Sequence, residues 1–411
     1  MTKTHIVSRT NLLREAGLAY FIVAFIARLP FAMMVVGVLT VAVSARGSLS
    51  LGGLTSAAVG LGTACFGPLL GAAADRFGQR VVLLTLAIAN ATTLVVFTVV
   101  VYGVAADPFV LLAAFGIGAT APQVAPMSRS RLVAIIDERM PESVRARTLS
   151  GTMAYESAAD ETVFVFGPFL VGVLASLIAP WAPLVIAAAL TVLFVGAFAL
   201  HPSGSHISRD RDADGRATSR AAELFRADLL VVVIGILGVG IFFGTMLTSL
   251  TSFMADRGAP EQAGLLYGVM GVGSAILALG VAWLPPRFSL RARWLVFSGT
   301  LLLGSLLLGF VDTTIGMTAA LAIMGVGIGP TLVTQYSFGA ARSPRGRSAT
   351  VMTMLGSGVI LGQSLGAAVT GEVAESIGTS GALMLPVIAA AITFATGILN
   401  WFLSHGRPRS R

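Results

Sequence analysis

Residues 71–80 read GAAADRFGQR and form a short polar interruption between two long apolar runs, at about 50–73 and 81–103. Each run is long enough to cross a bilayer, because about 20 apolar residues in a helix span its hydrocarbon core. Gly78 favours a tight turn, and Asp75, at a helix end, can pair with arginines or with the N-terminus of a facing helix. The stretch therefore predicts two membrane helices joined by a compact turn that can contact another part of the protein.

Apolar runs of this length recur along the whole chain. Of its 411 residues, 55% are hydrophobic and 11% are charged, whereas a soluble domain carries about 25% charge. We therefore predict an all-α membrane protein with twelve transmembrane helices. The runs lie at about 17–44, 50–73, 81–103, 108–127, 148–178, 182–200, 227–254, 263–284, 294–311, 315–339, 348–371 and 382–404.

The composition argues against several other classes of protein. Cys65 is the single cysteine, so the chain can form no internal disulfide or cysteine-based metal cluster. No phosphate-binding loop is found, so we expect neither ATP-driven transport nor an enzyme. The basic residues occur in short clusters without interleaved aromatics, so we expect no nucleic-acid partner. We expect no metal site or other cofactor either, because the histidines all lie in polar flanks: His5, His201, His206 and His405.

The distribution of positive charge predicts the orientation in the membrane. With the N-terminus in the cytoplasm and twelve crossings, all but three of the 27 Lys and Arg residues fall on the cytoplasmic side. The exceptions are Arg46 and Arg257, which face outward, and Arg28, which lies within the first helix. Residues 1–16 lack the features of a cleaved signal peptide, so the first helix is expected to remain. We therefore predict a bacterial inner-membrane protein with both termini in the cytoplasm.

The two halves of the chain resemble each other at corresponding places. Helix 4 contains Gly-Ile-Gly-Ala-Thr-Ala from Gly116, and helix 10 contains Gly-Val-Gly-Ile-Gly-Pro from Gly325. The sequence at 145–147 is Arg-Ala-Arg and that at 345–347 is Arg-Gly-Arg. A parallel repeat of this kind places a substrate site between the halves near the membrane midplane.

The repeat predicts the domain organisation. Two six-helix bundles follow each other along the chain, and three polar segments flank and connect them. The boundaries are 1–16 for a cytoplasmic N-terminus, 17–200 for the first bundle, 201–226 for a cytoplasmic interdomain loop, 227–404 for the second bundle and 405–411 for a cytoplasmic tail.

The stretch at 71–80 resembles the loop 2–3 motif of the major facilitator superfamily. That motif has a glycine, an Asp-Arg pair four residues later, then a glycine and a basic residue. The matching positions are Gly71, Asp75, Arg76, Gly78 and Arg80, whereas Gln79 departs from the usual basic residue. The resemblance implies two pseudo-symmetric bundles that alternate access, with these residues as a cytoplasmic latch. The alternative is an ordinary basic turn.

Charged residues inside the predicted helices are candidates for ion coupling. Arg28 lies about 16 Å into the first helix at 1.5 Å per residue, and helix 5 carries Glu156, Asp160 and Glu161 at a comparable depth. Ionisable groups at the midplane are expensive to bury and are therefore functional candidates. We expect Arg28 to pair with one acid while another, Asp160 before Glu156, takes and releases a proton. The alternative is a static ion pair, although three acids and one base would leave a surplus charge.

Helix 5 continues with Gly167, Pro168 and Gly172, where a bend is expected. The segment is similar to the antiporter motif of drug-exporting members of the superfamily, although Val163 and Val171 stand where that motif prefers glycine. This partial match favours export. A structural proline kink is the alternative.

Exporters of this type often have an arginine in helix 4. In an alignment on Gly116 the corresponding positions here are Leu112 and Phe115. We therefore expect helix 4 to lack that arginine, with Arg28 as a possible substitute.

Helices 1, 4, 7 and 10 face the central cavity in this fold, with 2, 5, 8 and 11 beside them. Their notable side chains are aromatic, sulfur-containing or amide groups, which suit amphipathic or apolar molecules. Helix packing or lipid contact is the alternative role for each. The candidates are Phe31, Met34, Gln123, Tyr155, Phe242, Phe243, Gln335, Tyr336 and Gln363.

The sequence as a whole predicts a secondary active transporter that works as a monomer. We expect proton-coupled efflux of small apolar or cationic compounds, with the proton gradient as the energy source and no cofactor. The alternatives are a transporter of sugars or other metabolites, in either direction, and, from another class, a transport-dead sensor or a lipid-moving protein.

Overall fold

The computed structural model describes residues 12–204, 219–258, 263–285 and 287–403, and these residues form helices and turns without a strand. The tail expected at 405–411 lies outside the described residues, as do 1–11 and 205–218 of the two other polar segments.

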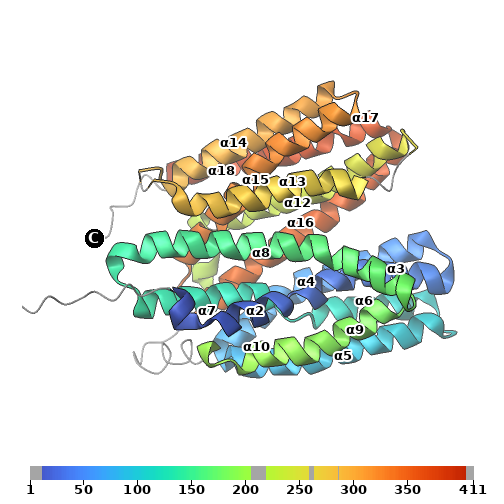
Figure 1. Cartoon of the computed structure of the whole chain (residues 1–411), viewed down its shortest axis with the longest axis horizontal. Helices are drawn as coiled ribbons and strands as arrows, with labels where there is room; N and C mark the ends of the chain where they lie inside the picture. The colour runs from blue at the N-terminus through green and yellow to red at the C-terminus, as the bar shows by residue number, and fades with distance from the viewer. Residues whose placement is uncertain (1–11, 205–218, 259–262, 286, 404–411) are drawn as a thin grey trace, which may run out of the picture.

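The first half of the chain forms one bundle, which lies in the lower part of Figure 1. Its helices are α1 (Leu12–Ala16), α2 (Leu18–Ile26), α3 (Leu29–Arg46), α4 (Leu49–Phe77), α5 (Gln79–Tyr102), α6 (Asp107–Ala119), α7 (Val124–Arg139), α8 (Glu142–Leu177), α9 (Ala182–Leu190), η1 (Thr191–Val195), α10 (Gly196–Leu200) and η2 (Pro202–Gly204).

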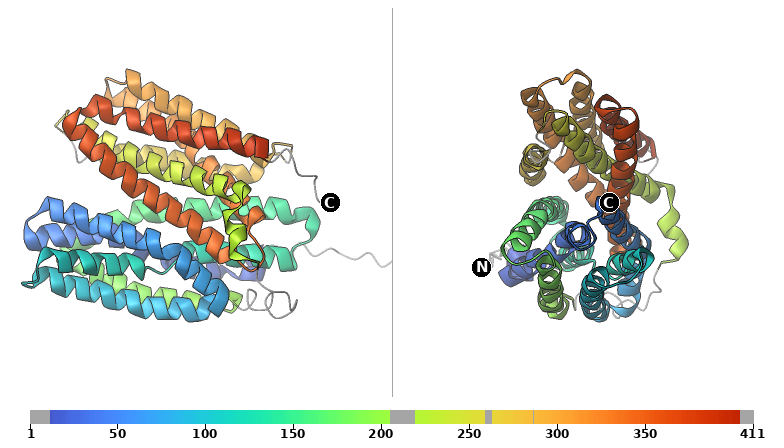
Figure 2. Two further views of the ribbon diagram at one scale, coloured as in Figure 1. Left: turned by 180° about the vertical axis from the view of Figure 1, so that it is seen from behind. Right: turned by 90° about the vertical axis from the view of Figure 1, so that its right-hand side faces the viewer.

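The second half forms the other bundle, which lies in the upper part of Figure 1 and is seen end-on in Figure 2. Its helices are η3 (Ala221–Phe225), α12 (Ala227–Ala255), α13 (Ala263–Gly280), η5 (Val281–Trp283), α14 (Leu290–Leu306), η6 (Leu307–Phe310), α15 (Thr314–Arg342), α16 (Ser348–Ser376), α17 (Thr379–Ala382) and α18 (Met384–Leu403).

Twelve helical segments of spanning length result, as the sequence predicts. Among the described residues, 11 segments are long and apolar enough to cross a membrane by length and composition alone. The twelfth is α8, whose 36 residues are ample in length but include acids and arginines that make it less apolar. It lies between the halves, against α3 of its own half and α13 and α15 of the other. The prediction of a twelve-helix, two-bundle fold is confirmed.

Two helices of the first half are interrupted in the middle of the bundle. α2 ends at Ile26 and α3 begins at Leu29, immediately before Pro30, which has no N–H to donate to the preceding turn. α6 ends at Ala119 and α7 begins at Val124, because Pro122 disfavours helical backbone at the residue before it. The fourth crossing therefore continues to Arg139, well beyond the expected end near residue 127.

The repeat predicted from the sequence has a structural counterpart at Arg46 and Arg257. Arg46 donates hydrogen bonds to the carbonyls of Val101 and Ala105 at 2.7 Å each, at the turn between α5 and α6. Arg257 donates to the carbonyl of Asp312 at 2.7 Å, at the turn between η6 and α15. Each arginine thus joins the end of the first crossing of its half to the turn between the third and fourth crossings.

The halves meet closely at the end of the bundle that carries Asp75, here called the basic end. Asp75 accepts hydrogen bonds from the backbone N–H groups of Thr350 at 2.7 Å and Ala349 at 3.1 Å, at the start of α16. The side chain of Arg293 in α14 donates to the hydroxyl of Ser150 in α8 at 3.2 Å. Figures 1 and 2 show α16 slanting across from the second bundle to the first, where it packs along α4. The basic end is therefore closed.

Candidate functional site

A cavity of about 110 Å³ lies between the two halves, and both contribute to its wall. The first half supplies the two helix interruptions and part of α8, whereas the second half supplies apolar side chains of α12, α15 and α16. The polar or charged lining residues are Arg28, Gln123, Arg129, Ser157, Asp160 and Tyr336. The remaining wall is largely apolar.

The helix interruptions place polar groups at this depth. Arg28 lies in the break between α2 and α3, and Gln123 directly precedes α7. Both side chains are buried, with exposed fractions of 4% each. An uninterrupted apolar helix would have presented only apolar side chains at this depth. The breaks at the two prolines therefore create the polar side of the cavity.

An ion network connects these breaks to α8. Arg28 Nη2 lies 2.5 Å from Glu156 Oε2, and Arg28 Nη1 lies 3.5 Å from Asp160 Oδ1. Arg129 Nη2, in α7, lies 2.5 Å from Asp160 Oδ2. Glu156 and Asp160 are four residues apart and so share one face of α8, as the sequence predicts.

The two acids of this network differ in their access to water. Glu156 is fully buried, and its Oε1 also accepts a hydrogen bond of 3.0 Å from the Ser128 hydroxyl, which in turn lies 2.8 Å from the Tyr20 hydroxyl. Asp160 is 20% exposed and lines the cavity. A proton can therefore reach Asp160 from the cavity more easily than it can reach Glu156.

The charges of the described network balance without the third predicted acid. Two arginines, Arg28 and Arg129, face two acids, Glu156 and Asp160. The side chain of Glu161, the third predicted acid, lies outside the described residues. The surplus-charge argument for a titrating acid therefore does not apply to the groups that the structure describes.

The fourth crossing contains a buried arginine at a different position from Leu112 and Phe115, where the exporters' arginine is missing. Arg129 and Arg131 are among the basic residues expected on the cytoplasmic side, but both lie within α7 with exposed fractions of 1% or less. Arg131 donates to Gln79 Oε1 and to the Phe198 carbonyl at 2.7 Å each, so it joins α7 to the start of α5 and to α10. Arg131 also lies near His201, at the end of α10. Burial, and then the positive charge of Arg131, lower the pKa of the His201 imidazole. The signal that could have identified Arg129 was Pro122, because the helix begins again after this proline and continues through residue 129.

Arg129 also contacts the second half. Its guanidinium carbon lies 3.9 Å from the centroid of the Tyr336 ring in α15, at the distance of a cation–π contact. Because the same guanidinium bonds Asp160, the charge state of Asp160 is connected through one side chain to the packing of the two halves.

Four of the nine residues expected to face the cavity line it: Phe31, Gln123, Phe243 and Tyr336. The other five lie elsewhere. Met34 is buried beside Asn90 in the first bundle, and Tyr155 packs edge-on against Phe21. Gln335 lies near Trp294 and Gly235 inside the second bundle, and Phe242 is fully buried there. Gln363 is partly buried on α16, with its carbonyl packed against Gly244 of α12.

The predicted latch residues surround the contact between α4 and α16. Asp75 meets the N-terminus of α16, one of the two partners expected for it, and its carboxylate also accepts a 2.5 Å hydrogen bond from the Thr350 hydroxyl. Gly71 allows α4 to approach α16, since a Cβ there would overlap Thr353 Oγ1. Gly78 has φ 90° and forms the tight turn. Arg76 and Arg80 are exposed.

The predicted bend residues of helix 5 have different surroundings. α8 runs as one helix through this segment, and the side chain of Pro168 lies outside the described residues. A Cβ at Gly167 would lie 2.6 Å from Ala32 Cβ of α3, so this glycine permits close helix packing. Gly172 has no other atom within 4 Å of such a Cβ.

Comparison with known proteins agrees with the twelve-helix fold. The sequence profile of the Major Facilitator Superfamily matches residues 18–367. No curated protein sequence matches the chain.

Several solved transporter structures share the fold across nearly the whole chain. The human organic anion transporter MFSD10 (TETRAN) is 17% identical with a TM-score of 0.71, over 95% of this chain and 100% of that one. The E. coli fucose:proton symporter FucP is 17% identical with a TM-score of 0.64, over 93% and 99%. A bacterial homologue of the iron transporter ferroportin, in an outward-facing state, is 14% identical with a TM-score of 0.72, over 96% and 100%.

Proposed function

The chain belongs to the major facilitator superfamily, and on that premise we propose that it is a proton-coupled secondary transporter whose substrate binds in the cavity between the halves. Transporters built from parallel repeats hold their substrate near the midplane and expose it alternately to each side by rocking one half against the other. The cavity described above lies between the repeats and receives residues from both. Asp160 supplies the proton site, and the contact between Asp75 and α16 closes one side.

The basic end is the cytoplasmic side in this proposal. Positive loops stay in the cytoplasm of a bacterial inner membrane, and the loops at this end carry most of the arginines. The closed contact of Asp75 with Thr350 then seals the cytoplasmic side, so a substrate would enter or leave the cavity from outside.

A small molecule with a largely apolar body fits the cavity wall. Phe31, Phe164, Phe243, Leu332 and Ile360 line it, and such surfaces bind apolar groups by removing them from water. This supports the apolar part of the substrate class expected from the sequence. A sugar would need more hydrogen-bonding groups than this wall offers, so a sugar transporter is the weaker candidate.

Proton coupling rests on one observation, which is the position of Asp160 in the cavity wall between two arginines. Ionised, Asp160 holds Arg129 and faces Arg28. Protonated, it no longer attracts them as an anion, so Arg129 is released from one partner and its contact with Tyr336 can change. A proton could thereby alter the packing between the halves, which is the coupling that alternating access requires.

Export is the direction that we propose, on the similarity of the Gly167–Pro168 segment to the antiporter motif. Gly167 packs against Ala32 of α3, next to the cavity residue Phe31, so this segment contacts the helix that begins directly after Arg28. Movement in either direction would be compatible with the geometry of the cavity itself.

The experiment uses the full chain in liposomes that contain a pH-sensitive dye. Lipophilic cations, organic acids, sugars and uncharged aromatic compounds are added in turn, with proton gradients of both signs. We expect one apolar class to move protons, and Asp160→Asn to abolish that movement. Glu142→Gln is the matched control, because Glu142 is an exposed acid at the start of the same helix. Substrate flux without proton movement in the unmodified protein would exclude the coupling.

A further inference from the structure

The unused hydrogen-bonding capacity of the cavity is mainly of the donor type. Arg28 Nε and Nη1, Arg129 Nε and the Ser157 hydroxyl are buried and have no hydrogen-bond partner among the described residues. All three side chains line the cavity and are at most 4% exposed. Buried donors without partners are costly, so a ligand that supplies acceptors would be stabilised here.

Asp160 in the cavity wall and Glu156 behind it are, in contrast, already occupied. Glu156 accepts from Arg28 and Ser128, and Asp160 accepts from Arg129 and faces Arg28. A cationic ligand would have to displace an arginine from one of them. An anionic ligand, in contrast, finds donors on Arg28, Arg129 and Ser157 that have no hydrogen-bond partner among the described residues.

We therefore infer that the cavity recognises amphipathic organic anions, with a carboxylate held by Arg28, Arg129 and Ser157 and an apolar body held by the second half. This inference rests on the proposed function and names the substrate class of the same site. It departs from the cationic compounds that the sequence suggested. Guanidinium groups suit a carboxylate because they present paired donors in one plane.

The apolar body has apolar partners on both halves of the cavity wall. Phe31 and Phe164 form an edge-to-face pair with ring centroids 6.4 Å apart on the first half. Phe243, Leu332 and Val359 line the same cavity from the second half. An aromatic or branched aliphatic body would be buried between these groups, while its carboxylate reaches the arginines.

Charge balance makes the anion bind together with a proton. Among the described side chains, the charged and titratable groups around Asp160 are Arg28 at the α2–α3 break, Arg129 of α7, Tyr155 and Glu156 of α8, and Tyr336 of α15. With both acids ionised, the two arginines are neutralised, and an added anion would leave a net negative charge in a poorly solvated site. A proton from solvent on Asp160 restores neutrality and frees Arg129 for the anion. The anion and the proton would then cross together, which replaces the exchange expected from the antiporter-like segment, and the net direction would follow the combined gradients of the anion and the proton.

The test compares three compounds of one shape: 4-phenylbutyrate, 4-phenylbutanol and 4-phenylbutylammonium. Binding to the purified full chain in detergent is measured by calorimetry, in buffers with different ionisation heats so that proton uptake is counted. We expect 4-phenylbutyrate to bind at least about tenfold more tightly than the other two, with uptake of about one proton per anion.

The Asp160→Asn variant gives the decisive result, because it should improve binding. Without the competing carboxylate, 4-phenylbutyrate should bind about tenfold more tightly in mildly alkaline buffer, without proton uptake or pH dependence. Ser157→Ala should weaken the anion selectively, whereas Phe243→Ala should weaken all three compounds alike. Weaker anion binding by Asp160→Asn, or equal binding of the ammonium compound by the parent, would overturn the inference.

Flux measurements separate this inference from the proposed function. Anion binding with proton uptake but without flux in liposomes would exclude transport and leave the anion site intact. Proton-coupled flux of the ammonium compound or the alcohol in preference to the anion would refute the anion site and leave proton-coupled transport intact.

Discussion

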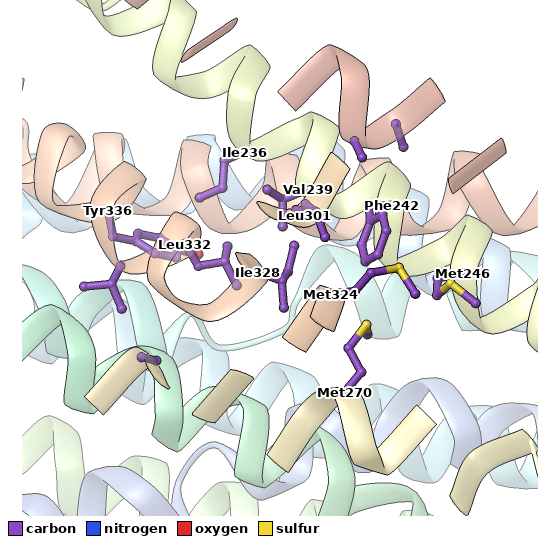
Figure 3. Close-up of a cluster of buried hydrophobic side chains, with 14 of the residues drawn as sticks. Ile236, Val239, Phe242, Met246, Met270, Leu301, Met324, Ile328, Leu332 and Tyr336 are labelled. Carbon is purple, nitrogen blue, oxygen red and sulfur yellow. The ribbon is translucent and has the colours of Figure 1, made fainter. Parts of the chain in front are cut away.

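The two halves of the molecule follow one helical plan but bury different chemistry at equivalent positions. Arg28 corresponds to Val239 under the offset of 211 residues that relates Arg46 to Arg257. By the offset of 200 that relates Arg145 to Arg345, Asp160 corresponds to Ile360. The second half is filled by an apolar cluster around Phe242, with methionines and branched side chains packed against it (Figure 3).

This difference shows that a symmetric fold can carry asymmetric chemistry. The backbone repeat is retained because Arg46 and Arg257 hold equivalent turns in both halves. The charged residues that line the cavity, Arg28, Arg129 and Asp160, all belong to the first half, so a single protonation there acts against the largely apolar wall of the second half. Four sets of substitutions test this comparison, from the largest expected effect to the smallest.

Removing one partner of the Arg28–Glu156 pair should have the largest effect. Arg28→Met alone would leave Glu156 without its counter-charge, and Glu156→Leu alone would leave Arg28 with only its 3.5 Å contact to Asp160, so each should cost about 3–5 kcal/mol. The double variant removes the pair, leaves the Arg129–Asp160 pair in place, and should be about as stable as the parent. Melting temperatures in detergent measure this. A double variant that loses as much as the two single variants combined would show that the pair is not a coupled unit.

The second largest effect is expected at the contact between the halves at Gly71. In Gly71→Ala, the new Cβ would lie 2.9 Å from the Ala349 carbonyl and 3.0 Å from Thr350 Cα, so α16 must move away. The closed basic end should lose about 1–3 kcal/mol. Spin labels on α5 and α14 at the basic end, in a Cys65→Ser background, should report longer distances.

Gly53→Ala is the matched control for Gly71→Ala. Gly53 lies on the same helix, and a Cβ there would meet no other atom within 4 Å. If both alanine variants shifted the label distances equally, close approach at Gly71 would not be what holds the end closed.

Asp75→Asn should weaken the same closure by a smaller amount. The carboxylate accepts two backbone N–H groups at the start of α16, where the helix dipole favours negative charge. Loss of the charge should cost about 1–2 kcal/mol of the closed state, measured by the same label distances. Thr350→Val removes only the hydroxyl bond and should have less effect. An Asp75→Asn protein with unchanged distances would argue against a latch.

The contact of Arg129 with Tyr336 should have the smallest effect. Tyr336→Leu removes the ring and should lower the stability by about 0.5–1 kcal/mol, whereas Tyr336→Phe keeps the ring and should be nearly unchanged. Melting temperatures compare the two variants. Equal losses of stability in the two variants would show that the hydroxyl group of Tyr336, and not its ring, is responsible.

Much of the site could be predicted because it depends on local patterns. Glu156 and Asp160 share a helix face by their spacing, and Asp75 and Gly78 lie at a turn whose geometry the residue types favour. Gln335 and Phe242 were misplaced because a helix that faces the cavity also has a buried side. The helical period alone does not tell which neighbour covers which face.

The sequence by itself determined the twelve crossings, their repeat and the acids of α8. Hydrophobic length and helical spacing are properties of contiguous residues, so no distant contact is needed to read them. The tertiary structure alone decided that Arg129 is buried against Asp160 and Tyr336, and that Asp75 meets α16. Arg129 is 31 residues from Asp160 and 207 residues from Tyr336, and Asp75 is 275 residues from Thr350. The helix break before α7 moves Arg129 from a predicted loop into the bundle. Only the packing of the helices brings such groups together, because a charge buried at this depth is stable only where the fold supplies its counter-charge.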